Sequence, residues 1–451
     1  MAPTATPPTS LEIFRSSATL RLLLIGLLSI ALLIPLAFVH SLLSERRQLR
    51  AEAAASIASG WAGPQLLMGP VLVLRFACAG FNDQRAPRTW RRSVTVLPDQ
   101  LLVRGRALSE IRRRGIHAVP VYDAKLHVEG EFAPRAAADL VVDCPAAVLI
   151  QADLALALAD PRGIEGLDGV TWNGARLAWQ SGTPLTGSWS SGVSARIPAD
   201  RLPDLVGTST AYTFDLGLRG SDRLSIAPAA GTTRVELTGD WPSPSFDGAF
   251  LPDERQVAGS SFRAAWRVSS LARPVPAVWT SEPPPALEKW AFGVTWFVAA
   301  DGYLMVERSL KHGFLFVLLT FLVFFLFELG GDARLHFVQY GLVGGALCVF
   351  YLLLLSLCEH FGVGVAYLAA ASATTLQVSL YSRAILGARR RALVLGAALA
   401  LLYAGLYMLI GAEELALLLG SVLLFVALGV LMWRTRDVDW SRMRPRTGTI
   451  P

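Results

Sequence analysis

The placement of long apolar runs constrains this chain more than any other feature. One run, LLLIGLLSIALLIPLAFVHSLL, covers residues 22–43, and no comparable run occurs between residues 44 and 312. Five more then follow in quick succession, at residues 313–329, 338–357, 361–381, 392–411 and 415–433. A helix needs about 20 apolar residues to cross a bilayer. The pattern therefore predicts six transmembrane helices, with one large soluble segment between the first and the second.

The overall composition also indicates a membrane protein. Charged residues make up 17% of the chain and hydrophobic residues 53%, whereas soluble proteins carry about 25% charge. The net charge of +6 comes without a basic patch interleaved with aromatics, which argues against nucleic-acid binding. The first run exceeds the roughly 7–15 residues of a signal-peptide core, so we expect an uncleaved anchor. A signal peptide, which Arg15 and Arg21 would also suit, is the alternative.

Arginines in the short loops predict the orientation of the helices. The loop between the fourth and fifth runs carries Arg383 and three arginines at 389–391, and five arginines follow the sixth run. The loop between the fifth and sixth runs carries Glu413 and Glu414 instead. Basic short loops stay in the cytoplasm. The expected organisation is a cytoplasmic tail (1–21), a first span (22–43), a periplasmic β-rich domain (44–312), a five-helix bundle (313–433) and a second cytoplasmic tail (434–451).

Within the soluble segment the hydrophobic period is two. In VYDAKLHVEGEF, residues 121–132, Tyr122, Ala124, Leu126 and Val128 fall on one face and charged residues on the other. YTFDLGLRG, TRVELTGD and FRAAWRVS alternate in the same way. Such alternation indicates strands with one buried and one solvated face. We predict an α+β membrane protein whose soluble domain is an antiparallel, sandwich-like β structure.

The four cysteines lack the spacing of a metal site. Cys348 and Cys358 lie in or beside an apolar run, whereas Cys78 and Cys144 lie in the soluble segment. No CxxC pair or Cys/His cluster is present, so we expect neither a metal nor a cofactor. In an oxidising compartment Cys78 and Cys144 could form a disulfide. Two buried thiols are the alternative.

The stretch DWPSPSFDGAFLPDER, residues 240–255, concentrates carboxylates and hydroxyls. Asp240 and Asp247 could form an acid/base pair with Ser243 or Ser245 as nucleophile. However, the prolines at 242 and 244 restrict the backbone, and no histidine lies nearby. We favour a structural turn over a hydrolase site. In that interpretation Trp241 and Phe246 would fix the turn to the core.

Four polar residues fall in or beside the apolar runs: Glu328, Glu359, His360 and Gln377. Ionisable groups within a membrane are functional candidates by default. Most of these lie at a predicted helix end, where the side chain can reach water, so we expect an interfacial structural role. A transporter or channel is the alternative, and it predicts a polar path that joins Gln377, Thr374 and Glu359.

Several phrases resemble the CreD family of bacterial inner-membrane proteins. These are SERRQLRAEAAASIASGWAGPQLLMGPVLVL after the first run, RRGIHAVPVYDAKLHVEGEF, WPSPSFDGAFLPDER with FRAAWRVSSLAR, and FVQYGLVGGALCVFYLLLLSLCEH. The candidate signature positions in them are Trp61, Gly63, Pro64, Trp241, Pro242, Phe246 and Pro252. The order of the phrases and the layout of the spans also match the family over nearly the whole chain.

The resemblance implies an inner-membrane protein of cell-envelope integrity, linked to two-component signalling that responds to nutrients and envelope stress. It brings no established catalytic residue or cofactor. The sequence itself has no P-loop, HExxH or G-x-S-x-G motif. We therefore predict a membrane protein that is not an enzyme, whose periplasmic domain senses or binds an envelope component, a cell-wall structure or a protein partner.

Overall fold

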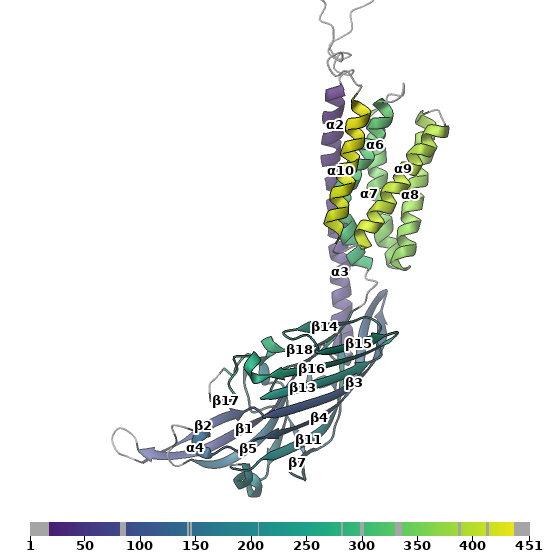
Figure 1. The fold of residues 1–451 in the computed structure, drawn as a ribbon. Helices are drawn as coiled ribbons and strands as arrows, with labels where there is room; N and C mark the ends of the chain where they lie inside the picture. Colours follow the sequence, from purple (N-terminus) through teal and green to yellow (C-terminus); the bar gives the residue numbers. More distant parts are fainter. Residues whose placement is uncertain are drawn as a thin grey trace, which may run out of the picture. The chain divides into compact units, whose positions relative to one another are not determined.

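The computed structural model describes residues 18–81, 87–141, 144, 147–205, 207–280, 283–297, 302–329, 336–386, 389–411 and 415–436 (Figure 1). It contains two compact units. The helical unit comprises Met1–Leu49 and Ala300–Pro451, and the β-rich unit comprises Arg50–Ala299. The loop at Glu413 and Glu414 and most of both predicted tails lie outside the described residues.

The first apolar run forms two consecutive helices, α2 (Ala18–Ala31) and α3 (Leu33–Trp61). The break between the two helices lies at Leu32. The N–H of Leu32 still donates to the carbonyl of Leu28 (2.9 Å). Pro35 explains the break, because it has no N–H to donate to the carbonyl of Ala31. From Leu33 the helix continues without interruption to Trp61, well past the apolar residues.

Six further helices follow the β-rich unit: α5 (Gly302–Lys311), α6 (Gly313–Leu329), α7 (Phe337–Cys358), α8 (Val363–Leu386), α9 (Arg389–Gly411) and α10 (Ala416–Thr435). Helices α5 and α6 are bent by 54° at their junction and together make one candidate span. The described residues thus give four spanning helices, or five with this bent pair.

The prediction of six spans is therefore wrong, and about five is the better number. The expected sixth span is a shorter apolar helix, Leu417–Trp433. At 1.5 Å per residue its apolar part is about 26 Å long, less than the roughly 30 Å of a bilayer core. The run counted from the sequence also included Leu415 and Ala416, two apolar residues that precede this segment.

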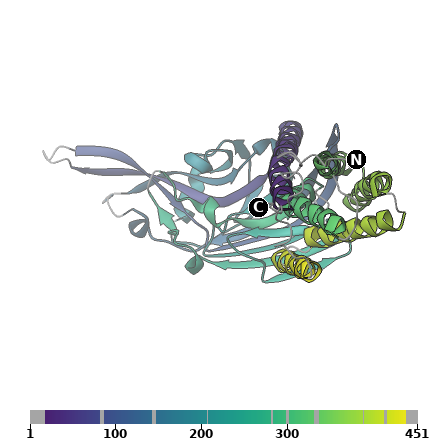
Figure 2. The same cartoon turned by 90° about the horizontal axis from the view of Figure 1, so that it is seen from above.

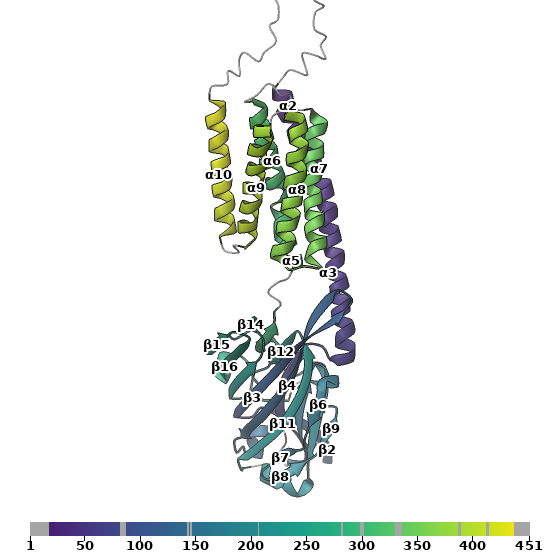
Figure 3. The same ribbon diagram turned by 90° about the vertical axis from the view of Figure 1, so that its right-hand side faces the viewer.

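Two nine-stranded sheets form the β-rich unit (Figures 1 and 3). The first sheet has the order β14 (Pro244–Gly248), β18 (Phe292–Trp296), β12 (Arg223–Ile226), β1 (Gln65–Phe81), β5 (Val148–Leu158), β10 (Gly192–Ile197) and β9 (Trp179–Ser181). In addition, β2 (Pro87–Val96) pairs with β1, and β17 (Val278–Trp279) pairs with β2. The second has the order β15 (Glu254–Ala258), β16 (Ser261–Ser269), β13 (Thr232–Gly239), β3 (Gln100–Arg114), β4 (His117–Phe132), β11 (Thr210–Ser221), β7 (Val170–Trp172) and β8 (Ala175–Leu177), and β6 (Ile164–Leu167) also pairs with β11. A short helix, α4 (Ala137–Leu140), precedes β5.

The predicted alternation of strand residues is confirmed. In β11, Tyr212, Phe214, Leu216 and Leu218 are buried while the residues between them are exposed or half-buried. They join one hydrophobic core to which both sheets contribute. The expectation of a purely antiparallel domain is wrong, because β1 pairs with β12 and β3 with β13 in parallel. Alternation of period two reports burial of one face and carries no information on strand direction.

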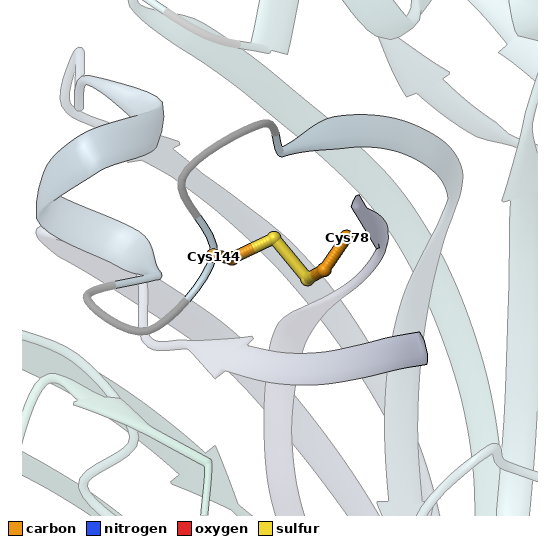
Figure 4. Close-up of a disulfide and its surroundings, with 2 residues drawn as sticks. All are labelled: Cys78 and Cys144. Carbon is orange, nitrogen blue, oxygen red and sulfur yellow. A yellow bond between two sulfur atoms is a disulfide. The ribbon is translucent and has the colours of Figure 1, made fainter. Parts of the chain in front are cut away.

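A disulfide joins Cys78 on β1 to Cys144, with the two Cα atoms 5.2 Å apart (Figure 4). The pairing resolves the alternatives left open by the sequence. It lies at the base of the ribbon formed by β1 and β2, which extends beyond the rest of the unit (Figure 2). Cys348 and Cys358 are free.

Candidate functional site

The signature residues Trp61, Gly63 and Pro64 lie where α3 ends and β1 begins. The Gly63 N–H donates to Oδ2 of Asp160 (3.1 Å), and its carbonyl accepts from the N–H of Ser221 (3.2 Å). Ala62, which stands between Trp61 and Gly63, is buried and has a φ of 145°, a conformation that L-residues rarely adopt. The Ser221 hydroxyl donates to the Ala62 carbonyl (3.0 Å). The chain thus leaves the helix through a tightly specified turn.

Gln65 completes this turn from inside the unit, where its side chain is 1% exposed. Its Nε2 donates to the carbonyls of Asp160 and Arg219, both at 2.9 Å, and its Oε1 accepts from the Asp160 N–H at 3.3 Å. One buried amide therefore connects the start of β1 to two distant segments. We call the set Trp61, Gly63, Gln65, Asp160 and Ser221 the α3 junction.

Charged groups cover the outer side of the α3 junction. The Trp61 ring lies between two guanidinium groups, with Arg112 3.6 Å and Arg219 4.4 Å from its centroid, distances typical of cation–π contacts. Arg162 donates to both carboxylate oxygens of Asp160 and to the carbonyl of Ser59 (3.1 Å), the latter in α3. These hydrogen bonds lower the pKa of Asp160 below its ordinary value of 3.8.

The stretch 240–255 connects the two sheets. Its first half forms β14 at an edge of the first sheet, and its end enters β15 at an edge of the second. Trp241 is buried and donates from Nε1 to the carbonyl of Phe297 (2.9 Å). Phe246 packs edge-on against Phe262 and Trp266. Pro242 is exposed and Pro252 is half-buried in the flanking turns.

The carboxylates of this stretch do not converge on a serine. Oδ1 of Asp240 accepts the backbone N–H of Ser109 (2.7 Å). Asp247 instead pairs with Arg223 (2.9 Å) and accepts the Thr295 hydroxyl (2.9 Å). Each is thus held by a different segment in a structural hydrogen bond.

The polar residues of the helical unit also lie apart from one another. Glu328 accepts the Tyr340 hydroxyl (3.1 Å), and His360 bonds through Nδ1 to the carbonyl of Ser356 (3.1 Å). Glu359 accepts the Tyr303 hydroxyl (3.0 Å) and lies 3.8 Å from Arg46.

The polar path that a transporter would need is not formed by the residues predicted for it. Gln377 is exposed on the outside of α8, whereas Thr374 is buried and donates to the Ala370 carbonyl one turn away (2.9 Å). Glu359 lies just beyond the end of α7, where it is held by groups of α5 and α3. These three side chains therefore do not line one path across the bundle.

A polar depression lies on the outer face of the second sheet. It has a volume of about 850 Å³, and β3, β4, β11, β13 and β16 contribute to it. We call it the charged groove. Its charged lining residues are Arg104, Arg106, Asp123, Lys125, His127, Glu165, Asp168, Asp215, Glu236 and Arg263.

Two like charges face each other in the middle of the charged groove. Arg106 on β3 is the direct cross-strand partner of Lys125 on β4, and both side chains are exposed. Like charges directly opposite on a sheet repel each other. The next two residues in the same row are Gly217 and Gly166, which carry no side chains.

Most other charges of the groove are paired. His127 lies 2.7 Å from Asp215, Arg104 pairs with Glu129 (3.2 Å), and Arg263 approaches Glu236 to 3.6 Å. Within the described part of the chain no carboxylate lies within ion-pair distance of Arg106 or Lys125. This pair was not singled out from the sequence. Alternation placed Lys125 on the solvated face, but only the register of β3 and β4 brings Arg106 opposite it.

Two comparisons with known proteins give the same family name. A family model described as "Inner membrane protein CreD" matches residues 17–441. The Inner membrane protein CreD of Escherichia coli (strain K12) is 32% identical over 414 residues, which cover 91% of this chain and 90% of that protein.

Proposed function

The chain belongs to the CreD family of inner membrane proteins, and from that premise we propose that it acts in cell-envelope integrity as a receptor without catalytic activity. In this proposal the β-rich unit lies in the periplasm and binds an anionic group of an envelope component at the charged groove. The α3 junction then relays binding to the helices.

The pair formed by Arg106 and Lys125 is the observation that carries this proposal. Their mutual repulsion is a cost to the folded protein unless an anion lies between them. Hydrogen bonds to a charged acceptor are about twice as strong as neutral ones, and the glycine side of the row leaves room for a bulky ligand. A carboxylate or phosphate of an envelope polymer or of a protein partner has the required charge.

Two independent observations support a periplasmic location. The N-terminal end of α2 and the connection between α8 and α9, which carries Arg383 and three further arginines, lie at the same end of the helical unit (Figure 1). Basic loops stay inside, so the chain that continues from the opposite end of the first span would be outside. The Cys78–Cys144 disulfide also fits an oxidising compartment.

Site-specific photo-crosslinking in intact cells tests the ligand proposal. A photoreactive residue at Thr238, in the row of Arg106, should yield a crosslinked product that disappears in Arg106→Glu/Lys125→Glu. The same residue at Ser269, at the end of β16, should not yield that product. Arg234→Glu/Arg255→Glu, an equal charge change on exposed positions, is the matched control. Equal products at both positions, or a product indifferent to the groove charges, would refute the proposal.

Thiol labelling tests the location. In a background with Cys348→Ser and Cys358→Ser, a cysteine introduced at Arg176, which is 70% exposed, should react with a membrane-impermeant maleimide in cells with a permeabilised outer membrane. Protection until the inner membrane is lysed would place the β-rich unit in the cytoplasm. For catalysis, Asp240→Asn/Asp247→Asn should leave the envelope phenotype unchanged, and loss of the phenotype in a folded variant would favour the hydrolase.

A further inference from the structure

The chain enters and leaves the β-rich unit at one edge, marked by Asp222 in the turn between β11 and β12. The Asp222 carbonyl accepts the N–H of Trp296, the last residue of β18 (2.8 Å). Arg50 of α3 is close enough to Asp222 to interact with its carboxylate electrostatically. The end of β18 therefore lies beside this edge, and Arg50 acts on it electrostatically.

Both connections from this edge to the apolar helices are short. Arg50 follows Leu43, the end of the first apolar run, by seven residues, which is about 10 Å of helix. Trp296 precedes the start of α5 at Gly302 by six residues, at most about 20 Å of extended chain. The link to α5 therefore limits how far the Trp296 end of this edge can lie from the apolar helices.

The hairpin of β3 and β4 extends past this edge. Pairing of β4 with β11 ends at Val121 and Ser221, and the Asp222 N–H donates to the carbonyl of Pro120 (3.1 Å). Pairing of β3 with β4 continues to Arg114 and His117. The five residues beyond Pro120 reach about 17 Å further. Figure 3 shows this extension beside the C-terminal part of α3, where Arg112 stacks on Trp61.

The end of this extension is basic and apolar at once. It carries three consecutive arginines, Arg112, Arg113 and Arg114, with Glu110 paired to the first of them (2.5 Å). Ile111 and Ile116 are 54% and 48% exposed. We call residues 111–117 the basic tip. Arginines alone are common on a hairpin exposed to water. Exposed isoleucines beside them are unfavourable in water and favourable at a lipid interface.

We propose that the basic tip docks on the surface of the bilayer that anchors the protein and binds the phosphates of anionic phospholipids. The arginines would neutralise headgroup phosphates, while Ile111 and Ile116 would enter the boundary between headgroups and acyl chains. Docking would give the β-rich unit a third attachment to the membrane, beside its two chain connections. The inference does not depend on the ligand of the charged groove or on the side of the membrane.

Fluorescence quenching in lipid nanodiscs tests this proposal with the full-length protein. Ile116→Cys, in a background with Cys348→Ser and Cys358→Ser, carries an environment-sensitive fluorophore, and the lipids carry a quencher at the headgroup boundary. We expect at least twofold stronger quenching in discs with about one-third phosphatidylglycerol than in pure phosphatidylcholine. A label at Arg176→Cys, on β8 and 70% exposed, reports on a position at the other end of β11 and should be unaffected by the lipid.

Charge reversal distinguishes lipid binding by the arginines from mere proximity of the basic tip to the membrane. Arg113→Glu/Arg114→Glu should abolish the lipid-dependent quenching at position 116, while Arg234→Glu/Arg255→Glu should leave it intact. The proposal would be overturned if quenching at position 116 were no stronger than quenching at position 176. Equal quenching in neutral and anionic discs would overturn the role of the anionic headgroup, and so would persistence in the charge-reversed variant. Unchanged maleimide reactivity of Thr213→Cys, a half-buried position of β11, confirms that each variant is folded.

Discussion

Replacing Gln65 by leucine should destabilise the β-rich unit while leaving its shape unchanged. The substitution removes two hydrogen bonds of 2.9 Å and one of 3.3 Å at a side chain that is 1% exposed. A buried hydrogen bond contributes about 1 kcal/mol, and an acceptor left unsatisfied costs about 1–3 kcal/mol. The Asp160 carbonyl keeps a second donor, the N–H of Gly163 (3.1 Å). The expected loss is therefore about 3 kcal/mol.

Urea unfolding of the full-length protein in nanodiscs, followed by tryptophan fluorescence, measures this loss. Ten of the twelve tryptophans lie between residues 61 and 296, so the signal reports on the β-rich unit. A loss of 3 kcal/mol corresponds to a melting point about 6–12 °C lower for a unit of this size. Gln256→Leu, the same change at an exposed position of β15, should stay within about 0.5 kcal/mol. If Gln65→Leu cost no more than this control, the α3 junction would not be held as described.

Three further predictions concern the same unit. Cys78→Ser/Cys144→Ser should lower its unfolding free energy by about 4 kcal/mol in urea titrations, because the disulfide closes a loop with a sequence separation of 66. Since hydrogen bonds from Arg162 lower the pKa of Asp160 from 3.8, its carboxylate stabilises the fold above about pH 4. This contribution is lost as the pH falls through the lowered pKa, and acid titration of Asp160→Asn should lack it. Trp61→Leu should cost about 1–2 kcal/mol in thermal unfolding through two lost cation–π contacts, and Trp61→Phe less.

Much of the architecture could be predicted because it follows from local patterns. The apolar runs identified the positions of the helices, and alternation in segments such as β11 and β16 identified strands and their buried faces. Span number was harder to predict. The apolar runs alone do not show that α5 joins α6 at a 54° bend, or that the last helix is a shorter apolar helix. Both depend on where helices break, which short sequence windows do not specify.

The candidate sites were less predictable because they depend on pairing between distant segments. Trp61 and Gly63 were singled out as positions of interest, yet the partners of Gly63, Asp160 and Ser221, lie far away in the chain. The stretch 240–255 suggested a catalytic site because its carboxylates are close in sequence. In the fold, Asp240 and Asp247 bind different segments, because Asp247 lies on β14 whereas Asp240 lies before that strand. Nearness in sequence is a weak guide within β structure, where neighbouring side chains point to opposite faces.

The α3 junction limits how binding at the charged groove could act on the helices. A groove ligand contacts β3, β4 and β11, and β11 ends at Ser221, which bonds to both Ala62 and Gly63. Any shift of β11 along its length must therefore either break these bonds or move the end of α3. Because α3 is one continuous helix from Leu33 to Trp61, such a movement would be passed toward the membrane without an intervening hinge. Weakening the junction at Ser221 should then leave ligand crosslinking at Thr238 intact while abolishing the envelope response, whereas a parallel loss of both would mean that the junction supports the groove itself.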